Sequence, residues 1–103
     1  MTTPRQVNET DIYQGEDEKI AYRLTTTPWA SSPTDITISF YDITYGGRVD
    51  ASSLLSGAAS VSGDIITCPT VQNLIPNRRY RLEIKFVSGG NTWEVFAIIN
   101  SEF

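Results

Sequence analysis

The side chains that could carry chemistry are few, and the densest group of them is acidic. Glu16, Asp17 and Glu18 are three consecutive carboxylates that follow Gly15. A calcium site needs about six to eight oxygen ligands at spaced positions, and three adjacent carboxylates lack that spacing. We therefore interpret this run as a solvent-exposed turn and expect no metal and no cofactor.

Nucleophilic and acid–base catalysis find little support in the sequence. The chain contains no histidine, which removes the usual base of serine and cysteine hydrolases and the commonest zinc ligand. The neighbouring Ser52, Ser53 and Ser56 therefore lack a base. Aspartates at turns usually bond their own backbone rather than act as an acid–base pair; the candidates here are Asp42, Asp50 and Asp64. We expect a protein that is not an enzyme.

Composition limits the partners and the setting. The chain has 103 residues and a net charge of -4, and the basic run Arg78, Arg79 and Arg81 is interleaved with acidic residues on a predicted strand, so we expect no nucleic acid. Cys68 is the one cysteine, which excludes an internal disulfide and favours a small buried side chain. We see no secretory signal and no apolar run long enough to span a membrane, so we expect no membrane partner.

The strongest structural signal is an alternation of period two near the C-terminus. Residues 79–87 place apolar and charged side chains on opposite faces, as in a half-buried strand. Ser88-Gly89-Gly90-Asn91 supplies the residues of a tight hairpin. The returning strand, 92–100, is apolar on both faces, so we expect a loop or another subunit to cover one of them.

Upstream residues predict further short strands at 7–13, 19–26, 35–43, around Val49 and at 64–68. Residues 50–55 could form one helical turn, capped by Asp50. We expect residues 1–103 to form a single domain, with residues 1–6 as a flexible tail. About seven short strands separated by turns predict an all-β fold, an immunoglobulin-like two-sheet antiparallel β-sandwich.

One local motif supports this fold. Leu74, Pro76 and Tyr80 have the spacing of a tyrosine corner, in which a tyrosine hydroxyl near the start of a late strand bonds to backbone a few residues upstream. The spacing resembles the corner of fibronectin type III domains, which implies a fibronectin type III-like sandwich and is silent on function.

A wider resemblance spans Tyr13 to Asn100. Trp29, the strand entry Gly63-Asp64-Ile65, Tyr80 and the closing strand from Trp93 to Ile99 together resemble the short immunoglobulin-like structural proteins of tailed bacteriophages and prophages. That resemblance implies a virion protein, assembled in the bacterial cytoplasm, that decorates a capsid or connects head, tail or fibre parts. Its partners would be other virion proteins or copies of itself, so a homo-oligomer or a particle-bound protein is expected.

Residues near loops or on the doubly apolar closing strand, most of them aromatic, are the candidates for such packing. The candidate interface residues are Trp29, Tyr45, Arg48, Trp93, Phe96 and Ile98. If the closing strand lies at a sheet edge, it could add to the sheet of a neighbouring subunit. The alternative function is a free-standing fibronectin- or immunoglobulin-like module that recognises a protein or glycan through its loops.

Overall fold

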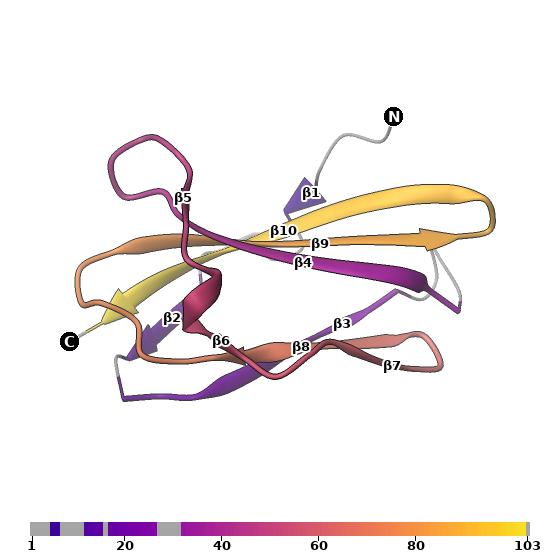
Figure 1. The fold of residues 1–103 in the computed structure, drawn as a ribbon, viewed down its shortest axis with the longest axis horizontal. Helices are drawn as coiled ribbons and strands as arrows, with labels where there is room; N and C mark the ends of the chain where they lie inside the picture. The colour runs from indigo at the N-terminus through magenta and orange to yellow at the C-terminus, as the bar shows by residue number, and fades with distance from the viewer. Residues whose placement is uncertain (1–4, 7–11, 16, 27–31, 103) are drawn as a thin grey trace.

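The chain forms two β-sheets that pack face to face around one core (Figure 1). The computed structural model describes residues 5–6, 12–15, 17–26 and 32–102. Within these residues the one helical element is the 3-10 turn η1, Ser52–Leu54. No described helix has the length and apolar character needed to cross a membrane. The all-β two-sheet sandwich expected from the sequence is therefore confirmed.

Sheet A has the order β1-β10-β9-β4-β5, and β2 also pairs with β10. Sheet B has the order β3-β8-β6, with β7 also pairing with β8. The strands of sheet A are β1 (Arg5–Gln6), β2 (Ile12–Gly15), β4 (Thr34–Asp42), β5 (Val49–Asp50), β9 (Arg79–Ser88) and β10 (Asn91–Glu102). Those of sheet B are β3 (Ile20–Thr25), β6 (Leu55–Ser56), β7 (Ser60–Ser62) and β8 (Ile65–Val71).

The expected seven strands correspond to β2, β3, β4, β5, β8, β9 and β10, and the three additional strands have two or three residues each. Of the expected opening strand at 7–13, Ile12 and Tyr13 belong to β2, and residues 7–11 lie outside the described residues. Within the expected tail at 1–6, Arg5 and Gln6 pair as β1 with Val95 and Phe96.

The β9–β10 hairpin forms the centre of sheet A and follows the sequence pattern closely. Tyr80, Leu82, Ile84 and Phe86 are all at most 5% exposed, and the intervening residues face solvent to different degrees. Gly89 and Gly90 have φ values of 59° and 81°, which are the positive values that a two-residue hairpin turn requires. The predicted alternation and turn are both confirmed.

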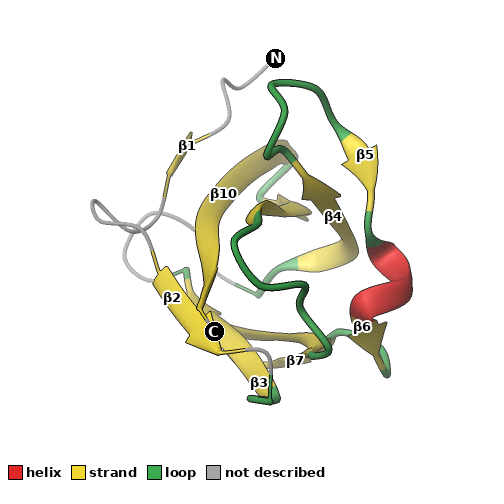
Figure 2. Ribbon diagram, turned by 90° about the vertical axis from the view of Figure 1, so that its left-hand side faces the viewer, coloured by secondary structure: helices red, strands yellow, loops and turns green. Residues whose placement is uncertain are grey.

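The expectation of a purely antiparallel sandwich is wrong at one edge. β1 and β2 both run parallel to β10, with Ile12 opposite Ile99 and Gly15 opposite Glu102. These pairings occupy the outer edge of β10, because β2 lies alongside it before the chain turns into sheet B (Figure 2). Within the described residues, β1 and β2 occupy positions 95–96 and 99–102 of this edge, so β10 is not the free edge that strand addition would need.

A buried polar side chain joins the two sheets at this edge. Gln14 on β2 is fully buried. Its Nε2 donates to the carbonyl oxygens of Val71 at 2.8 Å and Glu18 at 3.0 Å, and its Oε1 accepts from the Tyr22 hydroxyl at 2.6 Å. Val71 and Tyr22 belong to sheet B, so these bonds tie β2 of sheet A to the opposite sheet.

The single helical turn predicted within residues 50–55 is present as η1, but the predicted cap is wrong. Its N-cap is Ala51, whose side chain makes no capping bond. Asp50 instead accepts a hydrogen bond from the backbone N–H of Ser52 at 2.9 Å. Because Asp50 still pairs with Tyr41 as part of β5, it shapes the approach to the turn but does not cap it.

Candidate interaction surface

Exposed aromatic, apolar and basic side chains gather at one end of the sandwich, where β4 and β10 end and β9 begins (Figure 1). Two depressions of about 590 Å³ and 280 Å³ lie at this end and share Arg78 in their lining. We call this region the end surface and define it as Tyr13, Thr44, Tyr45, Val49, Ile75, Asn77, Arg78, Arg79, Asn100 and Ser101. Tyr45 is 83% exposed, Tyr13 63%, Val49 64% and Ile75 49%.

A charged network holds the middle of the end surface. Asp42 accepts hydrogen bonds from the backbone N–H and the hydroxyl of Thr44, at 3.0 and 2.6 Å, and forms an ion pair with Arg78 at 2.8 Å. The Thr44 hydroxyl also accepts from the backbone N–H of Arg79 at 2.9 Å. The Arg78 guanidinium lies 5.3 Å from the ring centre of Tyr45, within the range of a cation–π contact.

The electrostatics of Asp42 follow from these contacts. Burial by itself would raise the pKa of the Asp42 carboxyl, but the hydrogen bonds from Thr44 and the guanidinium of Arg78 together outweigh it and hold the pKa below its ordinary value. Asp42 is therefore ionised at neutral pH. Both oxygens of this ionised carboxylate accept hydrogen bonds, so Asp42 holds the start of the β4–β5 loop in place and is not poised to transfer protons.

The turn before β9 is locked by two hydroxyl groups. The Tyr80 hydroxyl accepts a hydrogen bond from the backbone N–H of Ile75 at 3.1 Å, and Leu74 and Tyr80 are both buried. Ser101 on β10 bonds through its hydroxyl to the backbone of Ile75 and of Arg78. Pro76 lies between these contacts, in the turn. The turn therefore presents Ile75 and Arg78 on a rigid support.

Two of the six candidate interface residues lie in a loop at this end of the molecule. Tyr45 and Arg48 both belong to the loop between β4 and β5. The Arg48 guanidinium lies over the Tyr41 ring at 5.7 Å and 3.7 Å from Glu83. Trp29 lies outside the described residues.

The other three candidates lie along β10 and are not brought together with Tyr45. Trp93 pairs with Phe86, near the opposite end of the hairpin, and packs against the core. Phe96 is half-buried under the Arg81 guanidinium, which lies 3.9 Å from its ring centre. Ile98 is 6% exposed. These residues offer less accessible area than the end surface does.

Sequence reasoning missed several members of the end surface. The sequence predicts Tyr13 at the end of an opening strand, but its pairing with Asn100 depends on a strand far away in sequence. Asn77 has a φ of 63°, a value that asparagine tolerates in turns. A residue of this type indicates a turn but does not indicate that the turn belongs to an interaction surface. Ile75 lies between Leu74 and Pro76 of the tyrosine corner, and the spacing of that motif does not indicate its exposure.

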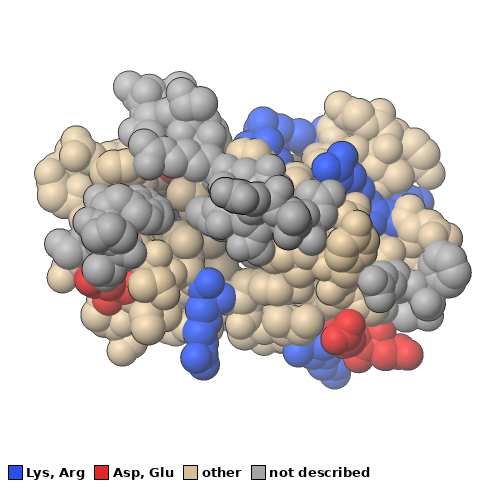
Figure 3. All heavy atoms as spheres, turned by 180° about the vertical axis from the view of Figure 1, so that it is seen from behind, with Lys and Arg blue, Asp and Glu red and all other residues tan. Residues whose placement is uncertain are grey.

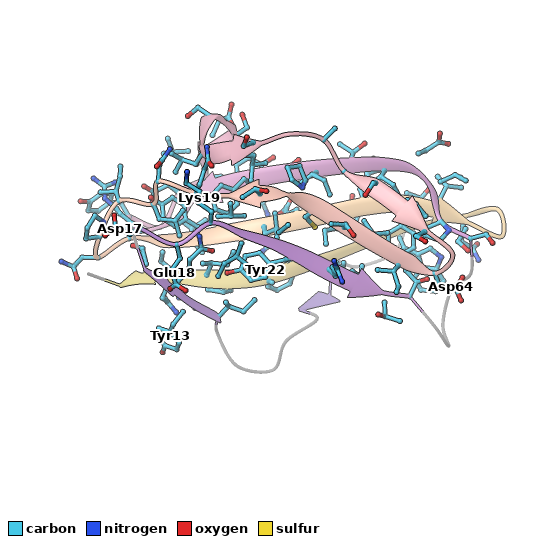
Figure 4. All side chains as sticks on the ribbon, turned by 90° about the horizontal axis from the view of Figure 1, so that it is seen from below. Tyr13, Asp17, Glu18, Lys19, Tyr22 and Asp64 are labelled. Atoms are coloured by element: carbon cyan, nitrogen blue, oxygen red, sulfur yellow. The ribbon has the colours of Figure 1, made fainter. Side chains whose placement is uncertain are left out.

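The described part of the acidic run, Asp17 and Glu18, forms an exposed turn as predicted, and Glu16 lies outside the described residues. The Glu18 carboxylate accepts a hydrogen bond from the backbone N–H of Gly15 at 2.7 Å, and Asp17 and Glu18 are exposed. Figure 4 shows them at the same end of the molecule as Tyr13, with Asp64 at the opposite end. Among the described residues, no three His, Cys, Asp or Glu side chains are grouped to hold a metal ion.

Cys68 is buried on the inner face of sheet B. Burial raises the pKa of its thiol to about 11, which keeps it protonated and unreactive at neutral pH. A structural role for this cysteine fits its position.

A scan against protein-family models found no match, and searches of curated proteins and of solved structures found no similar protein. Function is therefore inferred from the residues and geometry described above.

Proposed function

We propose that this chain is a non-enzymatic structural protein of a phage or prophage virion, an immunoglobulin-like domain that acts by packing against copies of itself or other virion proteins. The assignment to phage virions is supported by the sequence resemblance around Trp29, Asp64, Tyr80 and the closing strand. The same proposal makes the protein a virion component that is assembled in the bacterial cytoplasm.

The strand order supports the immunoglobulin-like part of the proposal. In immunoglobulin-type sandwiches the third, sixth and seventh strands share one sheet, often with a short extra strand beside the third, and the second, fourth and fifth strands form the other. Here β4, β9, β10 and the short β5 share sheet A, and β3, β6, β7 and β8 share sheet B. The Tyr80–Ile75 hydrogen bond stands where a tyrosine corner is found in that fold.

The observation that carries the packing function is the distribution of exposed apolar side chains. Of six large hydrophobic residues that are exposed in the described chain, four lie on the end surface, namely Tyr13, Tyr45, Val49 and Ile75. Exposed apolar residues that gather in one place, with arginine and asparagine among them, are typical of protein interfaces. The rigid turn at Ile75–Arg78 would lower the entropic cost of binding there.

The alternative is a free-standing module that recognises a protein or glycan through its loops. The exposure of Tyr45 at a loop tip beside the larger depression favours this reading as well. The two functions differ in oligomeric state, because a recognition module stays monomeric while a packing protein associates.

Light scattering coupled to size exclusion, run over a wide range of protein concentrations, tests the proposal. We expect a discrete multimer whose population rises with concentration. The substitution Tyr45→Ser should weaken it, whereas Val61→Ser, which removes an exposed apolar residue from β7 outside the end surface, should not. A monomer at every concentration would contradict self-packing and favour the recognition module.

A further inference from the structure

We propose that the outer edge of β3 binds an extended strand of another protein, antiparallel to β3, with an acidic side chain opposite Ala21. This inference goes beyond the proposed function, because it concerns a different surface and does not require two copies of this chain to associate. It rests on the strand pairing, on the direction of the backbone groups of β3 and on the charges beside Ala21.

β3 ends sheet B without a partner on its outer side. Within the described residues it pairs only with β8, and Figures 1 and 2 show it at the lower margin of the molecule. The register shift along this pair sets 21–23 of β3 against 67–70 of β8, so the extra residue lies in β8. β3 itself therefore keeps a regular outer edge.

The other described edges carry features that natural sheets use to prevent strand addition. β1 and β2 cover parts of the edge of β10. β4 contains an extra residue between Thr34 and Thr37 and is covered at its end by β5. β5, β6 and β7 have only two or three residues each. Among the described strands, β3 therefore offers the longest regular open edge.

The backbone of β3 has donors and acceptors that point away from sheet B. The N–H of Thr26 donates to the Asp64 carbonyl at 2.8 Å, on the side of β8. Since alternate residues of a strand direct their backbone groups to opposite edges, the groups that face outward are those of Ala21, Arg23 and Thr25. An incoming strand would bond to these groups and extend sheet B, whose described pairings are all antiparallel.

The side chains along this edge determine which charge the incoming strand must carry. Lys19, just before β3, and Arg23 are both exposed, and neither forms an ion pair among the described residues. Ala21 lies between them on the same face, because side chains alternate along a strand. A carboxylate opposite Ala21 would therefore lie diagonally to both cations.

The surroundings of this edge allow a partner to approach. In the lower half of Figure 3, uncharged surface separates the basic surface near the centre from the acidic surface toward either end. Figure 4 shows β3 running from Lys19 past Tyr22 toward the end where Asp64 lies. Ile20 and Tyr22 on the inner face of β3 are half-buried, so apolar side chains of the partner would pack beside them.

The same charges make a second copy of this chain a poor occupant. In an antiparallel pair about a twofold axis, opposite residues must face the same side of the sheet. A pair centred on Arg23 sets two guanidinium groups opposite each other, and one centred on Ala21 sets Arg23 opposite Lys19. A pair centred on Tyr22 sets Arg23 of one copy between Lys19 and Arg23 of the other. Like charges placed in this way are unfavourable, so the edge disfavours its own copy and admits an acidic strand.

A fluorescein-labelled, end-capped peptide with the sequence Thr-Val-Thr-Val-Glu-Val-Thr-Val-Thr tests the charge of the partner by fluorescence anisotropy. The matched peptide carries lysine in place of the glutamate. We expect the glutamate peptide to bind at least about tenfold more tightly at low ionic strength, because the two cations attract its carboxylate and repel the lysine. The double variant Lys19→Glu with Arg23→Glu should reverse this preference. The control variant Arg48→Glu with Lys85→Glu has the same net charge, with both changes at exposed positions outside sheet B, and should keep it.

Amide hydrogen exchange, measured by NMR, tests where the peptide binds. In the free chain the amides of Ala21, Arg23 and Thr25 should exchange faster than that of Leu24, which faces β8. Saturation with the glutamate peptide should slow these three amides by at least about tenfold, because their N–H groups then donate to the peptide.

Three results would overturn the inference. Equal binding of the two peptides, or binding of neither, would exclude an acidic partner strand. Slow exchange of the three outward amides in the free chain would show that the edge is already occupied. If that slowing appears only as the protein concentration rises, a second copy is the occupant. Because the end surface takes no part, each of these results leaves self-packing to be decided by light scattering. Circular dichroism confirms that each variant is folded.

Discussion

Replacing Gln14 by methionine tests the bond system that ties the sheets together. Methionine has nearly the same length as glutamine and bonds with none of the three partners of Gln14. The buried Val71 carbonyl would lose a bond worth about 0.5–1.5 kcal/mol, and the half-buried Tyr22 and the exposed Glu18 would each lose a bond of the same size. Because water can replace part of the latter, we expect Gln14→Met to lower the free energy of unfolding by about 1–3 kcal/mol.

Urea denaturation followed by tryptophan fluorescence measures this change, with the denaturant slope expected to stay constant. The matched control is Gln72→Met, at a half-exposed position just after β8, where the same substitution should change stability by less than about 0.5 kcal/mol. If Gln14→Met lies within about 0.5 kcal/mol of wild type, the bonds of Gln14 do not contribute net stability and the reasoning is wrong.

Two further predictions concern the support of the end surface. Tyr80→Phe removes the hydrogen bond to the Ile75 N–H and should cost about 1 kcal/mol; an unchanged midpoint of thermal unfolding would contradict this. The pKa of Asp42 is lower in the folded state than its ordinary value of about 3.9, so its ionised form stabilises the fold above about pH 4 and that contribution is lost as the pH falls through the folded pKa. Asp42→Asn should therefore be less stable than wild type at pH 7 and should lose less stability on acidification, as measured by urea titrations at several pH values; parallel pH profiles would refute the role of this carboxylate.

The parts of the fold that sequence predicted are those in which a few neighbouring residues carry the signal. The alternation of Tyr80, Leu82, Ile84 and Phe86 needs only the period of a strand, and the hairpin needs only Gly89 and Gly90 with their positive φ values. The acidic turn was recognised for the same reason, because Glu18 bonds to Gly15 within the same turn.

What sequence did not predict depends on pairing between distant residues. Tyr13 opposite Asn100 and Ile12 opposite Ile99 are parallel contacts between the two ends of the chain, and no local pattern encodes them. Gln14 is polar, and the hydrophobic pattern of a strand predicts burial only for apolar residues. Its burial is favourable because three partners satisfy its side-chain amide. The composition of the end surface was missed for the same reason, since it draws on β2, the β4–β5 loop, the turn before β9 and β10.

The parallel pairing of β2 with β10 also determines how the domain responds to force. A pull applied through Ile12 and Glu102 acts along the two strands in opposite directions, because they run the same way side by side. The inter-strand bonds from Ile12–Ile99 to Gly15–Glu102 are then loaded in shear, all at once, instead of opening one after another as in a peeled hairpin. Gln14 adds cross-sheet bonds at the same place. Such an arrangement resists rupture more than its number of bonds would indicate, a useful property for a part that holds an assembly together under tension.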